Sequence, residues 1–444
     1  MLLVYIPKIT NRCDYIFKLI FNELLGLDVN LTNNSDDFLT FEGPKINYSS
    51  KIFGDELFFD SAAILFETGI KVQELQFISF AGTVAFFPVY NKKSALPFDP
   101  FAASFYLVSR YEEYFPFIRD RYDRFEANQS IAYKNDFLKK PVVNIWALKI
   151  KETLLKKFPA LLFPKKNYQF IPTIDVDAAW SYKQKGVVRS LGGYCRSILN
   201  RDFSEIIRRT KVLANIIPDP FDTFTYQLEL QKKYNLKPIY FVLFAEYGLN
   251  DKNIPVNNPK FHILVKTLSD YAEVGIHPSY GSNTNPKKLQ LEVKNLSMVL
   301  NKEITRSRQH FLKLTFPTTY RNLINLDISD DYTMGYASET GFRAGICDSF
   351  LFYDIDQDAA TPLRVHPFAV MEGTLQSYKN ISADNAPYHL KQLIDEVKAV
   401  NGTFISLWHN QSLSNLDEWT GWRAVYEKMI ELAHGRSIQP SQKL

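Results

Sequence analysis

Acids, histidines and one arginine stand where apolar, strand-like segments end in the second half of the chain. Six residues share this position: Asp175 and Asp177 after QFIPTI, His277 after GI, Arg308 and His310 after ITRS, and His409 after ISLW. Carboxylates and imidazoles bind divalent metals, and they also accept and donate protons in catalysis. The set therefore offers the groups that a metal-dependent hydrolase needs.

Each of these residues also has a purely structural interpretation. Asp177 could begin a helix, His277 could be a hydrogen-bonded histidine in a turn, and His310 could be a hydrogen-bonded surface group. Because independent accidents would not all fall at strand ends, the set as a whole favours a site. His366, close to another strand end, is an outside candidate. The remaining histidines lie in helical patterns and are expected to be structural or exposed: His262, His389 and His434.

Strands and helices alternate from residue 166 onward, in roughly seven repeats. Strands are expected at QFIPTIDVD, KPIYFVLFA, GIH and TFISLWHN, and also around YTMGYA, FRAGI and FLFYDI. This alternation predicts a parallel sheet, either open or closed into a barrel. In a barrel the carboxyl ends of the strands meet at one mouth, where such folds place their chemistry.

Residues 1–165 mix short strands with helices and are predicted to form a smaller α/β domain in front of a barrel domain, residues 166–444. Thr10 is expected to cap a helix, and Asp99 to cap another that begins at Pro100. The basic, proline-containing segment FPALLFPKKN marks the boundary. Three charged residues of this first part are interpreted as surface or interface charges: Arg110, Glu112 and Glu113.

Composition excludes several classes of protein. The 444 residues carry 52 Lys+Arg and 48 Asp+Glu, a net charge of +4, and the basic residues are not gathered into one block, so no nucleic-acid partner is expected. No uncharged apolar run approaches the ~20 residues of a membrane span. The three cysteines are far apart in sequence, which suits a reducing compartment. Without a recognisable signal peptide, we expect a soluble, cytoplasmic protein of unknown oligomeric state.

Residues 166–444 resemble the polysaccharide deacetylase superfamily (NodB-type, carbohydrate esterase family four). TIDVDAAW matches its first motif, GIHPSYGSN the start of its second, and ISLWH its last. The resemblance implies a distorted (β/α)7 barrel that removes N- or O-acetyl groups from an acetylated sugar or glycan precursor, with a bound divalent metal such as zinc. The whole chain is also similar to a bacterial subgroup of deacetylase-like proteins with an α/β domain in front, through the segment FDPFAASFYLVSRYEEY.

The same resemblance implies roles for individual residues. Asp175 would be the general base and His409 the general acid, while Asp177 and His277 would bind the metal. The second motif normally supplies another histidine four residues on, where this chain has Gly281. The alternatives for the third ligand are His310, which stands where the family has proline, an oxygen of Ser279 or Asn283, or water.

Three further expectations concern substrate and orientation. Arg308 could hold Asp175 ionised. The aromatic residues Trp180, Tyr280 and Trp408 could stack on a sugar ring, although Trp408 equally fits an orientation away from the mouth, because neighbours on a strand alternate sides.

A catalytically inactive, glycan-binding or scaffolding barrel remains the alternative function. A glycosidase ranks last, because two acids on one strand end cannot bracket a bond from opposite faces.

Overall fold

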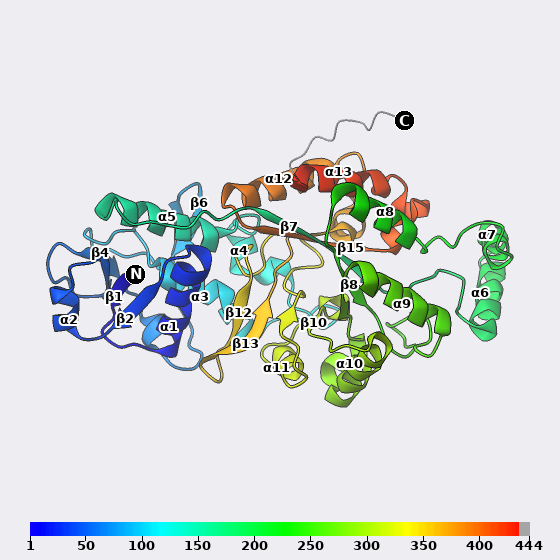
Figure 1. Cartoon of the computed structure of the whole chain (residues 1–444), viewed down its shortest axis with the longest axis horizontal. Helices are drawn as coiled ribbons and strands as arrows, with labels where there is room; N and C mark the ends of the chain where they lie inside the picture. The colour runs from blue at the N-terminus through cyan, green and yellow to red at the C-terminus, as the bar shows by residue number, and fades with distance from the viewer. Residues whose placement is uncertain (435–444) are drawn as a thin grey trace.

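The computed structural model describes residues 1–434, and two parallel sheets organise it (Figure 1). The first sheet has the strand order β2-β1-β3-β4. Its strands are β1 (Leu2–Tyr5), β2 (Val29–Thr32), β3 (Lys45–Ser49) and β4 (Leu57–Asp60), and a separate hairpin joins β5 (Phe77–Phe80) to β6 (Thr83–Phe86). The helices of this part are α1 (Asn11–Phe17), α2 (Ser35–Thr40), α3 (Pro100–Val108), α4 (Ile131–Lys134) and α5 (Val142–Lys157).

The second sheet has nine strands in the order β12-β13-β11-β10-β9-β8-β7-β15-β14. The strands are β7 (Gln169–Val176), β8 (Ile239–Val242), β9 (Glu273–Ile276), β10 (Arg306–Ser307), β11 (Asp330–Asp331), β12 (Phe350–Asp354), β13 (Ala359–Val365), β14 (Val370–Met371) and β15 (Thr403–His409). The helices are α6 (Val187–Leu199), α7 (Phe203–Leu213), α8 (Phe224–Tyr234), α9 (Pro259–Tyr271), α10 (Pro286–Leu300), α11 (Thr318–Ile324), α12 (Ala386–Ala399) and α13 (Trp422–His434).

The second sheet is strongly curved. His310 follows β10 and His409 ends β15, four places apart in the sheet, so a flat sheet would separate them by four spacings of about 4.8 Å, roughly 19 Å. Yet both imidazoles lie 3.7 Å from the same oxygen, Asp177 Oδ2. The curvature therefore brings the carboxyl ends of distant strands together, as expected of a barrel mouth.

A seven-stranded closed barrel is nevertheless not confirmed. The sheet has nine strands, and in residues 1–434 its edge strands β12 and β14 are not paired with each other. β12 pairs antiparallel with β13, whereas the other pairings are parallel. The observed architecture is thus an α/β fold built on an open, curled and mostly parallel sheet.

Two of the expected strands are wrong, because YTMGYA and FRAGI form irregular buried loops rather than strands. The strand next to YTMGYA is β11, which ends at Asp331, and the segment AATPLRV forms β13 instead. Backbone groups of the loops are partly satisfied by side chains, since Arg343 Nη1 donates to the Gly335 carbonyl at 3.0 Å. The apolar composition of these two segments indicates that they are buried, but it does not determine whether a buried segment is extended.

One hydrophobic core runs through both sheets. Because the two parts share this core, it does not mark where one domain ends and the next begins, and the domain boundary at 165/166 stays a prediction. A buried ionic network also joins the two parts. Arg110 Nε donates to Glu113 Oε1 at 2.8 Å, and Arg343 Nη2 donates to Glu113 Oε2 at 2.6 Å. Arg110 and Glu113 are therefore interface charges, one of the two interpretations that the sequence allowed.

In the part of the chain that the structure describes, none of the helices combines the length and the apolar character that a membrane crossing requires.

Candidate active site

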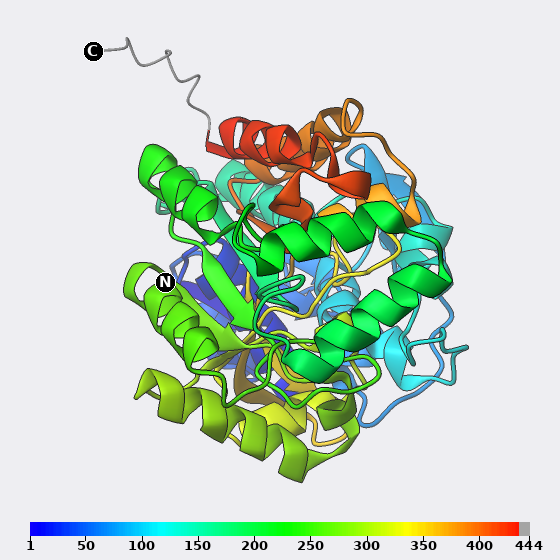
Figure 2. The same cartoon turned by 90° about the vertical axis from the view of Figure 1, so that its right-hand side faces the viewer.

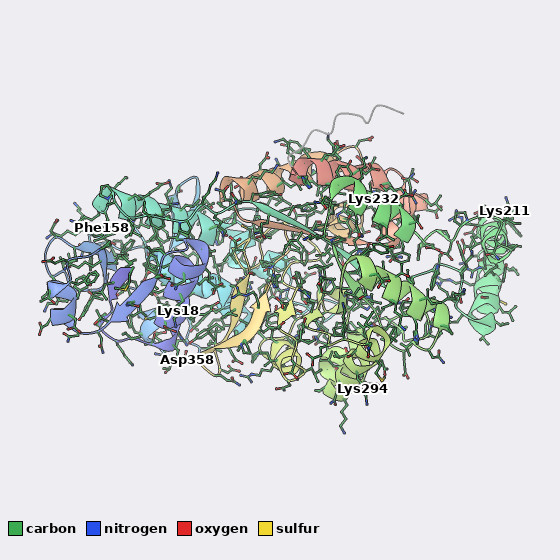
Figure 3. The ribbon with its side chains drawn as sticks, viewed as in Figure 1. Lys18, Phe158, Lys211, Lys232, Lys294 and Asp358 are labelled. Atoms are coloured by element: carbon green, nitrogen blue, oxygen red, sulfur yellow. The ribbon has the colours of Figure 1, made fainter. Side chains whose placement is uncertain are left out.

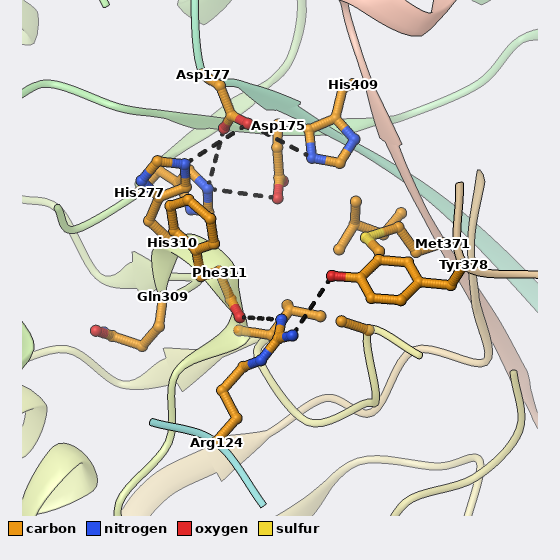
Figure 4. A pocket seen from close by; sticks show the side chains of 13 residues that line it. Arg124, Asp175, Asp177, His277, Gln309, His310, Phe311, Met371, Tyr378 and His409 are labelled. Atoms are coloured by element: carbon orange, nitrogen blue, oxygen red, sulfur yellow. Dashed lines mark hydrogen bonds and ion pairs between the residues drawn. The ribbon is translucent and has the colours of Figure 1, made fainter. Parts of the chain in front are cut away.

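A pocket opens at the carboxyl ends of the strands of the second sheet, and the predicted acids and histidines gather there (Figure 4). Side-chain alternation along β7 explains why Asp175 and Asp177 point the same way, while Ile174 and Val176 are buried on the other face. In the parallel ladder between β7 and β15, His409 is the register partner of Asp175. The strand pattern thus delivers groups from neighbouring strands to one place.

Asp175 is held by a buried arginine. Arg308 Nη1 donates to Asp175 Oδ1 at 2.8 Å, and Arg308 Nε donates to the Tyr332 carbonyl at 2.9 Å. Both charged side chains are almost fully buried. The second carboxylate oxygen, Oδ2, lies 3.7 Å from His277 Nε2 and faces the cluster. Because the arginine engages only Oδ1, the other oxygen is available to a proton or a water.

Asp177, His277 and His310 form a cluster of potential metal ligands. One ligand atom from each lies within 4.8 Å of the other two. Asp177 Oδ1 is 3.2 Å from His277 Nε2, and Asp177 Oδ2 is 3.7 Å from His310 Nε2. Two nitrogens and one carboxylate with an open side are a donor set typical of a catalytic zinc.

The orientation of His277 is fixed from behind. Its Nδ1 donates to the Arg308 carbonyl, which directs Nε2 at Asp177. Nε2 and Asp177 Oδ1 then face each other at 3.2 Å in a buried place. A cation bound between these two atoms would give the buried Asp177 Oδ1 a partner, so the residues present fit a divalent metal.

His310 is oriented in the same way by a carboxylate. Its Nδ1 lies 2.8 Å from Asp251 Oδ1, which also accepts the Tyr280 backbone N–H at 2.9 Å. Its Nε2 therefore points at Asp177. Such carboxylate–histidine pairs commonly stand behind metal-ligating imidazoles, because they fix the ring and raise its basicity.

His409 is positioned by Glu372, which follows β14. Glu372 Oε1 accepts from His409 Nδ1 at 2.7 Å and from the His409 backbone N–H at 2.9 Å. The ring's Nε2 faces the pocket, 3.7 Å from Asp177 Oδ2. The imidazole is thus fixed in a geometry from which Nε2 can exchange a proton with a bound molecule.

The acids of the site favour positive charge on two of its histidines, His310 and His409. Burial lowers the pKa of His310, but Asp177 and Asp251 outweigh it and raise that pKa to about 9. Burial likewise opposes charge on His409, and Glu372 and Asp177 raise its pKa to about 10. Burial would raise the pKa of Asp177, yet His310 and His409 hold it well below the usual range. The cluster therefore stabilises a cation at its centre.

The rest of the pocket wall is mixed. Phe311, Leu312, Met371 and Leu407 supply apolar surface. Arg124, from the first part of the chain, donates from Nη1 to the Phe311 carbonyl at 3.0 Å, and its guanidinium also pairs with Asp120 and approaches the Tyr378 hydroxyl (Figure 4). The pocket volume is about 170 Å³. That is well below the ~300–1,000 Å³ of sites that enclose a drug-sized ligand, so it suits a small group.

Three expected contacts with a sugar ring lack support. Of the two orientations that the sequence allowed for Trp408, the structure has the one away from the mouth: its indole is fully buried and donates to Met429 Sδ, because the alternation of β15 turns it away from His409. Trp180 is also buried, donates to Asp222 Oδ2 at 3.1 Å and does not line the pocket. Tyr280 packs edge-on against Phe311, behind the pocket wall.

The alternative oxygen ligands are engaged elsewhere. Ser279 Oγ donates to Glu292 at 2.6 Å, and Asn283 donates to the Lys313 carbonyl at 2.9 Å. Among the His, Cys, Asp and Glu side chains of residues 1–434, the cluster with the required geometry contains His310. The outside candidate His366 instead pairs with Asp330 and stacks on Tyr332.

Three residues of the site escaped the sequence analysis: Arg124, Asp251 and Glu372. Asp251 lies in an irregular segment, Glu372 begins the helical turn that follows β14, and Arg124 comes from a distant part of the chain. Ligating and catalytic histidines use both ring nitrogens, so each strand-end histidine is expected to have an acidic or carbonyl hydrogen-bond partner. This expectation is the signal in the sequence that points to acids such as Asp251 and Glu372.

Comparisons with known proteins give a family match and several structural matches. Residues 2–159 match the model of DUF7033, a family of unknown function. No curated protein matches the chain.

Solved structures match over about 60% of the chain. A protein of Mycobacterium smegmatis assigned as a polysaccharide deacetylase is 12% identical, with a TM-score of 0.40 over 61% of this chain and 86% of that one. The polysaccharide deacetylase Bc1974 of Bacillus cereus is 11% identical (TM-score 0.30, 60% and 86% covered). BA3943 of Bacillus anthracis, a CE4 family pseudoenzyme, is 13% identical (TM-score 0.30, 60% and 61% covered). The likeness is remote in sequence and in structure.

Proposed function

We propose that the protein is a metal-dependent hydrolase that removes an acetyl group from a sugar or a glycan precursor. The observation that carries this proposal is the cluster of Asp177, His277 and His310, whose ligand atoms lie within 4.8 Å of one another. It stands beside two other oriented groups, the Asp175–Arg308 pair and the His409–Glu372 pair. Together they match the needs of acyl transfer to water: a metal site, a base and an acid.

A divalent metal, zinc by its donor set, would be held by Asp177 Oδ, His277 Nε2 and His310 Nε2. When bound, the metal supplies a Lewis acid that polarises the acyl carbonyl and favours the ionisation of water. His310 thereby takes the place of the histidine that Gly281 removes from the usual motif. Asp251 and the Arg308 carbonyl hold the two rings in the required direction.

Asp175 serves as the general base. Its Oδ1 accepts from Arg308, while Oδ2 faces the cluster and accepts the proton of the attacking water. Because the carboxylate is buried, solvent screens its charge only weakly, and this strengthens its attraction for the proton that it accepts. Asp175 lies two residues before Asp177, and the strand alternation therefore sets base and metal ligand side by side.

His409 serves as the general acid. Glu372 binds Nδ1 and fixes the ring, so that the Nε2 proton points at the pocket and passes to the departing amine or alkoxide. Glu372 is a positioning residue, since it contacts the imidazole and does not line the pocket. Its Oε1 accepts from both the ring and the backbone N–H of His409, and these two hydrogen bonds direct the carboxylate at His409.

The pocket shape supports an acetyl group as the part that enters. A volume of about 170 Å³ with apolar walls at Leu312, Met371 and Leu407 accommodates a methyl-bearing acyl group rather than an oligosaccharide. The remainder of the sugar would then lie across the rim, where Arg124 and Tyr378 offer hydrogen bonds. An assay of acetate release from different acetylated sugars identifies which sugar carries the acetyl group.

The proposal is tested by metal content and by acetate release from N- and O-acetylated sugars. We expect about one zinc or another divalent ion per chain, lost in Asp177→Ala and in His310→Ala but kept in the control His366→Ala. Asp175→Asn should keep the metal and lose roughly 10²–10⁴-fold in rate. A wild-type protein without metal after zinc is added back would overturn the proposal in favour of an inactive, glycan-binding barrel. Full activity of Asp175→Asn would remove Asp175 as the base.

A further inference from the structure

Two helices, α6 (Val187–Leu199) and α7 (Phe203–Leu213), form a hairpin inserted after β7. They lie at the end of the molecule opposite the four-stranded sheet (Figure 1), and Figure 2 looks onto that end. Because β7 ends at the pocket with Asp175 and Asp177, the segment that follows it lies on the mouth side of the sheet. The hairpin is therefore an extension beside the pocket entrance.

The hairpin presents apolar side chains to solvent. Val188 is 84% exposed, Leu199 83% and Phe203 66%. Along α6 the apolar residues recur at helical spacing and form one exposed stripe, which continues into the first turn of α7: Val187, Val188, Leu191, Ile198, Leu199 and Phe203. We call these six residues the apolar stripe. In an ordinary surface helix such a stripe faces the core.

The packing of α6 explains why the stripe stays outside. The helix meets α7 through small residues on another face, since Ser197 is buried and a side chain added at Gly193 would collide with the Arg209 guanidinium. Side-chain contacts fasten the hairpin to the rest of the chain, including Arg208 to Asp417 at 2.9 Å and Tyr182 to Glu205 at 2.7 Å. The stripe is thus held exposed by the fold rather than left over from a loose segment.

The hairpin is also strongly basic, which the balance of the whole chain conceals. The hairpin, residues 187–213, contains six Lys+Arg and two Asp+Glu, a net charge of +4, as large as that of the entire chain. Some of these cations serve internal contacts, but Arg196, Arg201 and Lys211 are exposed, and Lys211 lies at the outer end of the molecule (Figure 3). Basic residues are thus concentrated on this hairpin, although they do not form one uninterrupted block in the sequence.

From this combination we propose that the α6–α7 hairpin docks onto an anionic membrane surface. A helix with an apolar stripe flanked by Lys and Arg lies in the lipid interface with its apolar face among the acyl chains and its cations at the anionic headgroups. A second copy of the chain would bring two hairpins of charge +4 together, and their repulsion opposes that pairing. Nucleic acid would leave the aliphatic stripe without a partner. The anionic bilayer satisfies both the stripe and the charge.

Docking of this kind would bring the pocket mouth close to the membrane. The metal cluster begins at Asp177, ten residues before the first helical residue of the hairpin, Val187. A substrate carried at a membrane surface, such as a glycan precursor with a lipid anchor, would then reach the pocket without leaving the bilayer. The docking itself does not depend on the proposed activity, because its readout is binding.

The test is flotation of the full-length protein with vesicles of phosphatidylcholine and phosphatidylglycerol, beside vesicles of phosphatidylcholine alone. We expect binding to the anionic vesicles that falls as ionic strength rises. Val188→Asp/Leu199→Asp should weaken it by at least about tenfold, and Arg196→Glu/Arg201→Glu by about fivefold or more for each residue. Val72 and Leu162 are 84% and 86% exposed outside the hairpin, so Val72→Asp/Leu162→Asp is the matched control and should bind like wild type.

Each other outcome overturns the proposal. Failure to bind anionic vesicles would do so directly, and an equal loss in the control variant would show that the hairpin has no special part. A wild-type dimer that Val188→Asp/Leu199→Asp dissociates, without vesicle binding, would assign the stripe to a second copy of the chain. Circular dichroism and thermal midpoints of all variants confirm that they are folded, since the substituted side chains are exposed.

Discussion

The same device orients every histidine of the site. One ring nitrogen is bound from behind, by a carbonyl for His277, by Asp251 for His310 and by Glu372 for His409, and the other nitrogen is left to face Asp177. The partner decides which nitrogen carries the proton, and with it whether the free nitrogen donates or accepts. The chemistry of the site therefore resides as much in these partners as in the histidines.

Asp251 gives this idea a direct test. In Asp251→Asn the negative charge behind His310 is lost, so the ring is a weaker ligand, and we expect zinc affinity to fall about 10–100-fold in a competition titration with a chromophoric chelator. Asp330→Asn is the control, because Asp330 forms a similar 2.7 Å pair with His366 outside the cluster. Unchanged affinity in Asp251→Asn would mean that His310 is not a ligand.

At the scale of single residues, strand ends were informative and loops were not. Asp175, Asp177, His277 and His409 were found because an apolar strand predicts where its last side chain points. Asp251 and Glu372 follow no such rule, since Asp251 belongs to an irregular segment and Glu372 to a helical turn after the short strand β14, and the path of both depends on tertiary packing. Trp408 failed for a related reason: the strand was correct, but alternation admits two faces, and only the position of α13 decides between them.

At the scale of elements, helix starts in the first part follow local chemistry. Thr10 accepts the Cys13 backbone N–H and begins α1, as expected, and Asp99 caps α3 with Pro100 in the first turn. Asp99 does more than cap, because its carboxylate also accepts the Tyr48 hydroxyl and the Ala62 backbone N–H, both at 2.7 Å. It joins the start of α3 to β3 and to the segment after β4.

Asp99→Ala should therefore cost more than an ordinary cap. The two N–H groups of α3, the Tyr48 hydroxyl and the Ala62 N–H would lose their acceptor in a buried place, and we expect the free energy of unfolding to fall by more than about 2 kcal/mol. Chemical denaturation measures this. Asn34→Ala removes the exposed cap of α2 and should cost about 1 kcal/mol or less. Equal losses in the two variants would contradict the wider role of Asp99.

The α6–α7 hairpin shows where element prediction stopped. Residues 180–221 received no element from the sequence analysis, although the apolar stripe of α6 has clear helical spacing. Gly192 and Gly193 interrupt the stripe and lower the helix propensity of the segment. Gly193 turns out to serve helix packing, since it leaves room for Arg209. The propensity penalty was thus overridden by a tertiary contact that a single sequence does not reveal.

At the scale of the whole molecule, the alternation of strands and helices predicted the α/β class but not the closure of the sheet. Closure depends on the two edges, and here the hairpin of β12 and β13 extends one edge, with β12 antiparallel. The sequence likewise does not predict that the two parts of the chain pack against each other. Residues far apart in sequence, Glu113 and Arg343, form a buried bidentate pair, and the hydrophobic core continues across both sheets.

That union reaches the pocket itself through Arg124, which belongs to the segment matched by the family of unknown function. Its guanidinium holds the Phe311 carbonyl and lines the pocket, but it is not paired with Asp175 or with the metal cluster. Arg124 should consequently affect how substrate binds and leave the chemical step to the residues of the second sheet. The first part of the chain would then contribute specificity to a site that the second part builds.

For Arg124→Met we expect KM to rise about tenfold or more, the loss of a charged hydrogen bond, with kcat changed much less and the metal content unchanged. Arg119→Met is the control: Arg119 lies in the same segment, is exposed and pairs with Asp123, so its loss should leave both constants near wild type. A fall in kcat at constant KM would instead place Arg124 among the groups that act in the transition state. Steady-state acetate release, on the substrate found for the wild-type protein, distinguishes these results.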